Sequence, residues 1–209
     1  MATLLRIDSS PLGAGTSFSR QLTGEFVQEW QRRNPDGKVI TRDLAATELR
    51  PVHAEWIAAA HTPEANLTSR QREILATSDE LIAELKAADE YVIGVPMHNF
   101  SIPSVLKLWI NQVARAGKTF SYQNGAPAGL LLDKKATFIT ASGGVYDQGS
   151  PAAAMNFVEP YLRSVFGFIG VTDTHFVNAG GTGKVNYGVD RQTILEPALA
   201  SIREKFKAA

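Results

Sequence analysis

The chain has no cysteine among its 209 residues. Disulfide bonds, thiolate metal sites and thiol redox chemistry are therefore excluded, and any electron transfer requires a bound cofactor. The sequence also has no excess charge, because 21 Lys and Arg residues balance 21 Asp and Glu residues. A neutral chain has no overall field to attract a nucleic acid or an anionic membrane surface, so we expect neither partner.

Long apolar runs are also missing. The short apolar run near the N-terminus contains Arg6 and Asp8, which argues against a signal peptide or a membrane segment. We therefore expect a cytoplasmic protein. We also expect a single domain over residues 1–209, because 44% hydrophobic residues at this length suffice for one substantial core. The four histidines show no metal-binding spacing, so no metal site is expected. These histidines are His53, His61, His98 and His175.

Two kinds of hydrophobic pattern alternate along the chain. Short apolar or β-branched runs predict strands, and longer stretches with apolar residues three or four positions apart predict helices. The predicted strands are residues 3–7, 38–43, 91–95, 136–140 and 171–177. The predicted helices are residues 17–33, 68–87, a helix that starts at 102–103, and residues 152–166 and 191–207. Residues 44–67 are predicted to be irregular.

This alternation indicates an α/β fold in three layers, a five-stranded parallel sheet with helices on both faces, because right-handed crossovers place helices on the two sides. The doubly wound, flavodoxin-like strand order is the simplest solution for five strands. Such a sheet binds ligands outside the carboxyl ends of its strands, near the point where the strand order reverses. The loops after strands one, three and four are therefore the first candidates for a site.

The loop after the first strand, residues 9–19, consists mostly of small hydroxyl residues and glycines and leads into a helix. A helix N-terminus attracts anions and glycines let the backbone approach closely, so this loop suits a phosphate. A simple turn with an N-cap at Thr16 or Ser17 is the alternative. Phe18 stands where a dinucleotide fingerprint needs its third glycine, and Val185 stands where a P-loop needs Ser or Thr, so neither motif is present.

The other two loops suit a flat heteroaromatic ring. Residues 96–103 combine apolar bulk with Asn99, whose amide is suited to the edge of such a ring, although Met97 and Phe100 are equally compatible with the core. Gly143 and Gly144 follow the fourth strand, where consecutive amides can converge on an anionic edge. An ordinary glycine turn is the alternative for this third loop.

Five segments occur in an order and spacing that match a known family along nearly the whole chain. They are Ser9-Ser10 with Ser17 and Ser19, Pro96-Met97 with Asn99-Phe100, Arg115-Ala116-Gly117 leading to Thr119-Phe120, Gly143-Gly144, and Gly167-Phe168-Ile169-Gly170-Val171. With these segments the sequence resembles the FMN-dependent NADH-azoreductases, also called NADH:quinone oxidoreductases, of the flavodoxin-like fold.

The resemblance implies an enzyme that binds FMN non-covalently and takes electrons from NADH or NADPH. Quinones and azo compounds would accept them by a ping-pong mechanism. It also implies a homodimer with active sites at the interface, and substrate contacts at Phe100 and Phe120, with Phe120 as an aromatic wall. The FMN contacts that it implies are Ser10, Ser17, Phe18, Ser19, Pro96, Met97, His98, Asn99, Phe100, Ser142, Gly143 and Gly144.

Three positions depart from the family pattern: His98 replaces a common Tyr, Ala141-Ser142 replaces Ser-Arg, and Lys118 replaces an apolar residue. The flavin carries the chemistry, so we expect positioning residues and no catalytic acid or base. His98 is a candidate proton donor, because imidazole titrates near neutral pH, with an edge hydrogen bond or plain solvent exposure as the alternatives.

Two other functions remain open from the sequence. One is a flavodoxin-type electron carrier, although such carriers are usually strongly acidic and this chain is neutral. The other is an α/β serine hydrolase with Ser142 as nucleophile, although Ser142 lacks the first glycine of the G-x-S-x-G elbow.

Overall fold

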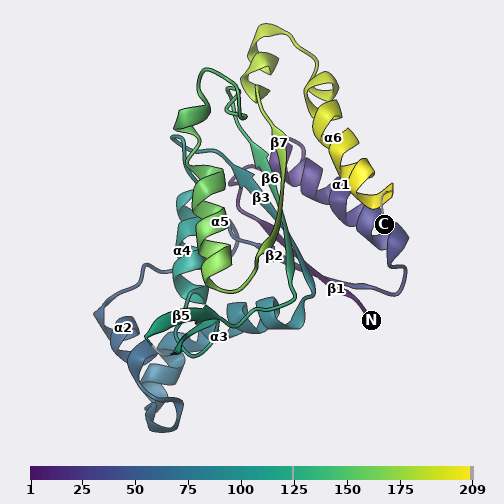
Figure 1. Cartoon of the computed structure of the whole chain (residues 1–209). Helices are drawn as coiled ribbons and strands as arrows, with labels where there is room; N and C mark the ends of the chain where they lie inside the picture. The colour runs from purple at the N-terminus through teal and green to yellow at the C-terminus, as the bar shows by residue number, and fades with distance from the viewer. Residues whose placement is uncertain (124, 208–209) are drawn as a thin grey trace.

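The computed structural model describes residues 1–123 and 125–207, and its centre is a parallel sheet of five strands (Figure 1). The strands lie in the order β2-β1-β3-β6-β7, which is the doubly wound order predicted from the sequence. They are β1 (Thr3–Asp8), β2 (Lys38–Asp43), β3 (Glu90–Pro96), β6 (Lys135–Ala141) and β7 (Asp173–Ala179).

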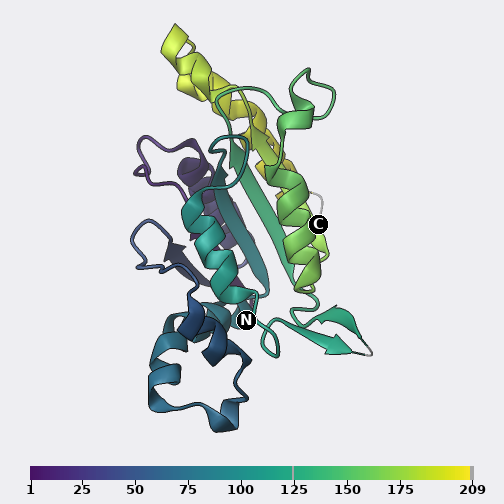
Figure 2. The ribbon, with the colours of Figure 1, turned by 90° about the vertical axis from the view of Figure 1, so that its left-hand side faces the viewer.

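Helices cover both faces of this sheet, which completes the predicted three-layer α/β fold. Helices α1 (Phe18–Arg33) and α6 (Arg191–Lys207) pack together on one face. Helices α3 (Ser69–Ala87), α4 (Ser104–Val113) and α5 (Val158–Phe168) cover the other, and Figure 2 shows α4 and α5 in front of the sheet. Within the described residues, none of the helices combines the length and the apolar character needed to span a bilayer.

The core is divided in two by the sheet. Val92 of β3 packs among side chains of α1 and α6, whereas its neighbour Ile93 packs among side chains of α3, α4 and α5. Successive side chains of a strand point to opposite faces, so a strand that is covered on both sides must be apolar at every position. This explains why the central strands read as unbroken apolar runs in the sequence.

Helix starts follow the capping residues that the sequence offers. The Ser17 hydroxyl accepts a hydrogen bond from Arg20 N (3.3 Å) and caps α1. Ser17 is one of the two N-cap residues that the sequence suggested for this helix, the other being Thr16. Thr68 and Gln71 form a reciprocal capping box at the start of α3. Helix α5 starts at Val158, six residues later than predicted, because Asn156 Oδ1 accepts hydrogen bonds from the first free amides.

The stretch predicted to be irregular contains a helix, α2 (Ala54–His61), and a short 3-10 turn, η1 (Glu64–Asn66). The prediction was wrong because an eight-residue helix is marginal by itself and depends on tertiary contacts. Trp56 provides them: its side chain is buried with Leu75 of α3, and its Nε1 donates to Gln112 Oε1 at 2.9 Å.

Two further elements differ from the expectation. A hairpin of β4 (Phe120–Gln123) and β5 (Ala126–Gly129) lies outside the main sheet, and strands of four residues are too short to show a pattern in the sequence. The last strand lies two residues later than predicted, because Asp173 pairs with Lys135 at the start of β6.

The hairpin meets the connection between α5 and β7 through two glycines, Gly129 and Gly170. A Cβ on Gly129 would lie 2.1 Å from the backbone nitrogen of Gly170. We expect Gly129→Ala to lower the free energy of unfolding by about 1–3 kcal/mol, because one of the two backbones must move. Gly167→Ala is the control, since Gly167 is exposed on α5 with nothing within 4 Å of its Cβ position. Chemical denaturation measures both, and equal stability of Gly129→Ala and the wild type would contradict the close contact.

Candidate functional site

The carboxyl ends of the strands meet at one edge of the sheet. Asp8 of β1 pairs with Gly94 of β3, and Pro96 at the end of β3 pairs with Ala141 at the end of β6. The chain leaves β1 toward α1 on one face and leaves β3 toward α4 on the other, so a crevice opens between the two connections. A cavity of about 390 Å³ occupies this crevice.

Most of the predicted cofactor residues line this cavity. Its walls come from the β1–α1 loop, the end of β3, the end of β6 and the β7–α6 loop. The lining residues are Ser10, Pro11, Leu12, Thr16, Ser17, Phe18, Ser19, Pro96, Met97, His98, Ala141, Gly143 and Thr182. Four predicted residues belong to the same loops without lining the cavity: Asn99, Phe100, Ser142 and Gly144.

The first wall is the N-terminal turn of α1. The amide groups of Phe18 and Ser19 have no acceptor within the described part of the chain, and both residues line the cavity. No acidic residue occupies the first turn. Free amides at a helix N-terminus, together with the helix dipole, create a positive potential that favours an anion.

Hydroxyl groups surround these amides. Ser10 Oγ accepts a hydrogen bond from Leu12 N (3.2 Å), and in the described residues its own proton has no acceptor, so it can be donated to a ligand. Ser17 Oγ and Ser19 Oγ lie 3.2 Å apart and share one hydrogen bond. Ser9, in contrast, donates to the Gly94 carbonyl at 2.6 Å and therefore joins β1 to β3 instead of facing the cavity.

A tight turn forms the rim after β3. His98 and Ser101 exchange backbone hydrogen bonds of 2.9 and 3.0 Å, and the two residues between them, Asn99 and Phe100, have φ of 48° and 69°. Positive φ at both central positions is the pattern of a type I′ turn, which Asn tolerates and Phe rarely adopts. The strain costs about 1–3 kcal/mol and persists only where contacts enforce it. Phe157 N supplies one such contact by donating to the Phe100 carbonyl (3.0 Å).

The opposite wall is braced by a loop that the sequence did not predict as part of the site. The carbonyls of Gly143 and Gly144 accept hydrogen bonds from Gly183 N (3.1 Å) and Gly181 N (2.8 Å) of the β7–α6 loop. The amides of Gly143 and Gly144 are left without an acceptor in the described residues. Thr182 of the same loop lines the cavity, and the glycine run after the last strand was the available signal for it.

Phe18 is held in place from outside the cavity. The Arg191 guanidinium lies over the Phe18 ring, 3.7 Å from its centroid, and Arg191 Nε donates to Gln21 Oε1 at 3.1 Å. A stacked guanidinium restricts the ring while leaving its other side to pack against a ligand. Helix α6 thus supports the anion-binding end of the cavity without contributing to its lining.

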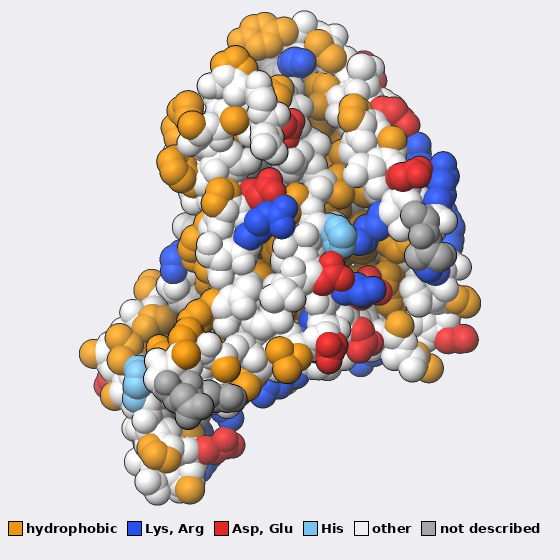
Figure 3. All heavy atoms as spheres, viewed as in Figure 1, with side chains coloured by type: hydrophobic (Ala, Val, Ile, Leu, Met, Phe, Trp, Pro, Cys, Tyr) orange, Lys and Arg blue, Asp and Glu red, His pale blue; other side chains and the backbone are white. Residues whose placement is uncertain are grey.

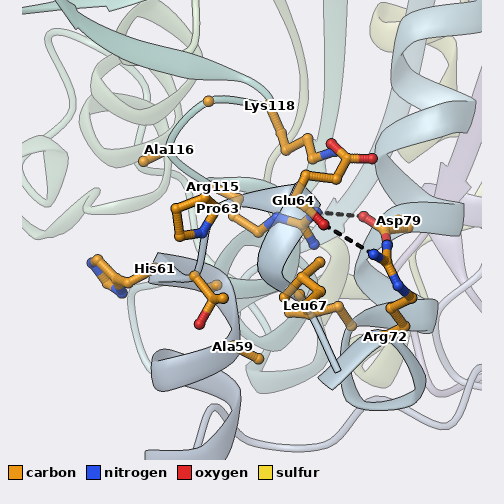
Figure 4. A pocket seen from close by; sticks show the side chains of 14 residues that line it. Ala59, His61, Pro63, Glu64, Leu67, Arg72, Asp79, Arg115, Ala116 and Lys118 are labelled. Carbon is orange, nitrogen blue, oxygen red and sulfur yellow. Dashed lines mark hydrogen bonds and ion pairs between the residues drawn. The ribbon is translucent and has the colours of Figure 1, made fainter. Parts of the chain in front are cut away.

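A second cavity, of about 460 Å³, lies between α2, α3 and the connection from α4 to β4 (Figure 4). Its charged groups are paired with one another. Lys118 Nζ lies 2.8 Å from Glu64 Oε2 and lowers the pKa of that carboxyl, and the buried Arg115 pairs with Asp79. Arg72 donates to the Glu64 carbonyl (3.0 Å). Lys118 therefore joins two surface segments and does not face the first cavity.

Phe120 also lies away from the first cavity within one chain. It begins β4, just beyond the end of α4, and its ring centroid is 4.5 Å from that of Phe168. Helix α4 runs antiparallel to the strands, so its end and the hairpin lie near the amino edge of the sheet, as Figure 1 shows. The predicted substrate contact at Phe120 therefore requires a cavity on another copy of the chain.

Comparison with known proteins agrees with this geometry. A family described by its flavodoxin-like fold matches residues 2–206. An FMN-dependent NADH:quinone oxidoreductase of Acidobacterium capsulatum is 56% identical over 205 residues, 98% of each chain. A protein of the same name from Nostoc punctiforme is 45% identical over 204 residues, again 98% of each chain.

Solved structures are similar over almost the full length. An azoreductase from Bacillus anthracis superposes with a TM-score of 0.88 at 29% identity and covers 99% of both chains. An FMN-dependent NADH-azoreductase from the same species, in complex with FMN, superposes with a TM-score of 0.87 at 25% identity, covering 99% of this chain and 98% of its own. The chain therefore belongs to the flavodoxin-like family that contains the FMN-dependent NADH:quinone oxidoreductases.

Proposed function

We propose that this chain binds FMN non-covalently in the 390 Å³ cavity and transfers two electrons from NADH or NADPH to quinones and azo compounds. The observation that carries the proposal is the convergence of free helix amides, serine hydroxyls and apolar walls at the strand-order reversal. The names of the similar proteins support the same activity.

The phosphate of FMN fits the α1 end of the cavity. Ser10, Phe18 and Ser19 line this end, and in the described residues the amides of Phe18 and Ser19 and the hydroxyl proton of Ser10 have no acceptor. No Lys or Arg occurs among the lining residues, so the helix dipole and these neutral donors would hold the phosphate charge. This resembles other helix N-terminal phosphate sites and needs no additional cation.

The ring of FMN fits the apolar end. Pro96 and Met97 present apolar surface, and Gly143 of the adjacent loop lines the cavity with them, with its amide free of an acceptor in the described residues. Bound FMN supplies the capacity to accept a hydride and pass it on. The protein orients the ring, and the glycine amides stabilise negative charge at its edge. One open side must serve the nicotinamide and the acceptor in turn, which predicts ping-pong kinetics.

The two alternative functions are less well supported. The Ser142 hydroxyl donates to the Gly144 carbonyl at 2.9 Å, and no histidine is its hydrogen-bond partner in the described residues, so it lacks the base that a hydrolase nucleophile needs. An electron carrier would need only FMN and a protein partner. Turnover of NADH with a quinone by the purified chain alone would exclude a pure carrier.

We propose further that the active protein is a homodimer. Large apolar side chains are exposed beside the cavity, including Phe157 (59%), Val145 (43%) and Met155 (41%). Figure 3 shows hydrophobic side chains gathered over the β6–α5 connection that carries them. In the proposed dimer a second copy covers this surface and places its own Phe120 at the cavity, which Phe120 of the same chain does not line.

The first prediction concerns the cofactor. Purified protein, or apoprotein given FMN, should show flavin absorption that NADH bleaches under anaerobic conditions and a quinone restores. Initial rates at several quinone concentrations should give parallel double-reciprocal lines. A chain that stays colourless with FMN would contradict the proposed function, whereas intersecting lines would contradict the ping-pong order alone.

The second prediction concerns the interface. Ser17→Asp keeps a good helix cap but places a carboxylate against the phosphate, so this chain should lose FMN. Phe120→Ala keeps the FMN site but lacks the aromatic wall. Each variant homodimer should have low activity. Co-expression of the two variants should restore activity, because the mixed dimer has one site in which both Phe120 and the loop from Ser10 to Ser17, here called the phosphate loop, are intact.

Two measurements decide the interface prediction. The mass in solution, from light scattering during gel filtration, should be twice that of one chain. Activity of the co-expressed pair equal to the average of the two separate variants would show that Phe120 does not act on the partner's cavity.

A further inference from the structure

Arg20 contacts the phosphate loop but does not line the cavity. Its Nε and Nη2 donate to the Ser10 carbonyl at 3.1 and 2.6 Å, and its Nη1 and Nη2 donate to the Asp43 carboxylate at 2.8 and 2.6 Å. The side chain is 11% exposed, and the buried Asp8 lies 3.8 Å away. All three donor nitrogens are therefore engaged, in a planar fork that only a guanidinium can form.

The same residue also holds the other end of the loop. Arg20 N donates to the Ser17 hydroxyl, which caps α1. The loop runs from Ser10 to Ser17, so one residue fixes both of its ends, and Asp43 at the end of β2 fixes that residue in turn. Hydrogen bonding to Arg20 lowers the pKa of Asp43, so the pair is ionised at neutral pH.

These contacts set the direction of the Ser10 peptide. Ser10 belongs to the lining of the cavity and Arg20 does not, so the Ser10 carbonyl that Arg20 binds points toward Arg20 and not into the open cavity. Without the fork, rotation of this peptide would bring a carbonyl oxygen, with its partial negative charge, toward a bound phosphate. Within the described residues, the hydrogen bonds of the Arg20 side chain go to Ser10 and Asp43 and not to the loops that would meet the ring.

We propose that Arg20 is a positioning residue that shapes the loop for phosphate, so that the site selects FMN over riboflavin, which has the same ring but no phosphate. This inference rests on the proposed function. A group that acts only through the phosphate loop should affect the two flavins unequally, whereas a residue needed only for general stability should affect them equally.

The test measures the dissociation constants of FMN and riboflavin for flavin-free protein, from the quenching of flavin fluorescence. For Arg20→Gln we expect FMN affinity to fall by about tenfold or more, as is typical of lost charge-assisted hydrogen bonds, with riboflavin affinity changed by less than about twofold. Arg20→Lys should be intermediate, because an ammonium keeps the charge but not the fork.

Matched variants separate positioning from stability. Arg32→Gln is the control on the same helix, since Arg32 is 64% exposed and its ion pair among the described residues is with Glu29, so it should change neither constant. Asp43→Asn keeps Arg20 but weakens its anchor, and it should cause a smaller loss that is also specific to FMN. If Arg20→Gln does not fold, as judged by circular dichroism and thermal unfolding, Arg20→Lys and Asp43→Asn provide the test.

Three outcomes are distinguishable. A loss of affinity for FMN alone would support the inference. Equal losses for both flavins, or no change in either, in a protein whose wild type binds FMN, would overturn it and leave the proposed function intact. A wild-type protein that binds neither flavin would overturn the proposed function, and the inference with it.

Discussion

The close approach of α1 to strands β1 and β3 is the constraint on which the cavity depends. A Cβ on Gly94 of β3 would lie 3.0 Å from Thr23 Cγ2 of α1 and 3.1 Å from Asp8 Oδ1 of β1. Thr23 donates to Asp8 (2.7 Å), and Ser9 donates to the Gly94 carbonyl, so the three elements are joined at one buried point. This junction directs the first turn of α1 over the carboxyl edge of the sheet, where its free amides can meet an anion.

The rest of the cavity is held by contacts between loops, and its lining stays free to bind. The carbonyls of Gly143 and Gly144 are bound by the β7–α6 loop, and the Ser10 carbonyl is bound by Arg20. In each case a backbone acceptor at or beside the cavity is already satisfied by the protein, and in the described residues the amides of Phe18, Ser19 and Gly143 have no acceptor. Such an arrangement suits a ligand that brings its own negative charge, and it explains how a cavity with no lining Lys or Arg can serve a phosphate.

The departures from the family pattern now have places in the fold. His98 lines the cavity with an exposed side chain, and Lys118 pairs with Glu64 at a different cavity. Ser142 donates its hydroxyl to the Gly144 carbonyl and thereby shapes the glycine loop. Backbone amides, which do not titrate, would then contribute to the field around a bound ring.

Hydrophobic periodicity in the sequence was enough to predict the five strands of the main sheet, the helices other than α2, the doubly wound order and the three loops at the carboxyl edge. These features follow from local patterns, since a strand covered on both faces or an amphipathic helix must show its burial in its own residues. Helix α2 was missed because Trp56 is stabilised by Leu75 and Gln112, which are distant in the sequence. Three features were decided only by the tertiary structure. They are the place of Thr182 in the cavity lining, the hydrogen bonds of Arg20 to Ser10 and Asp43, and the distance of Phe120 from the cavity of its own chain. Each depends on contacts between segments brought together by the sheet, and no pattern within one segment records its partner.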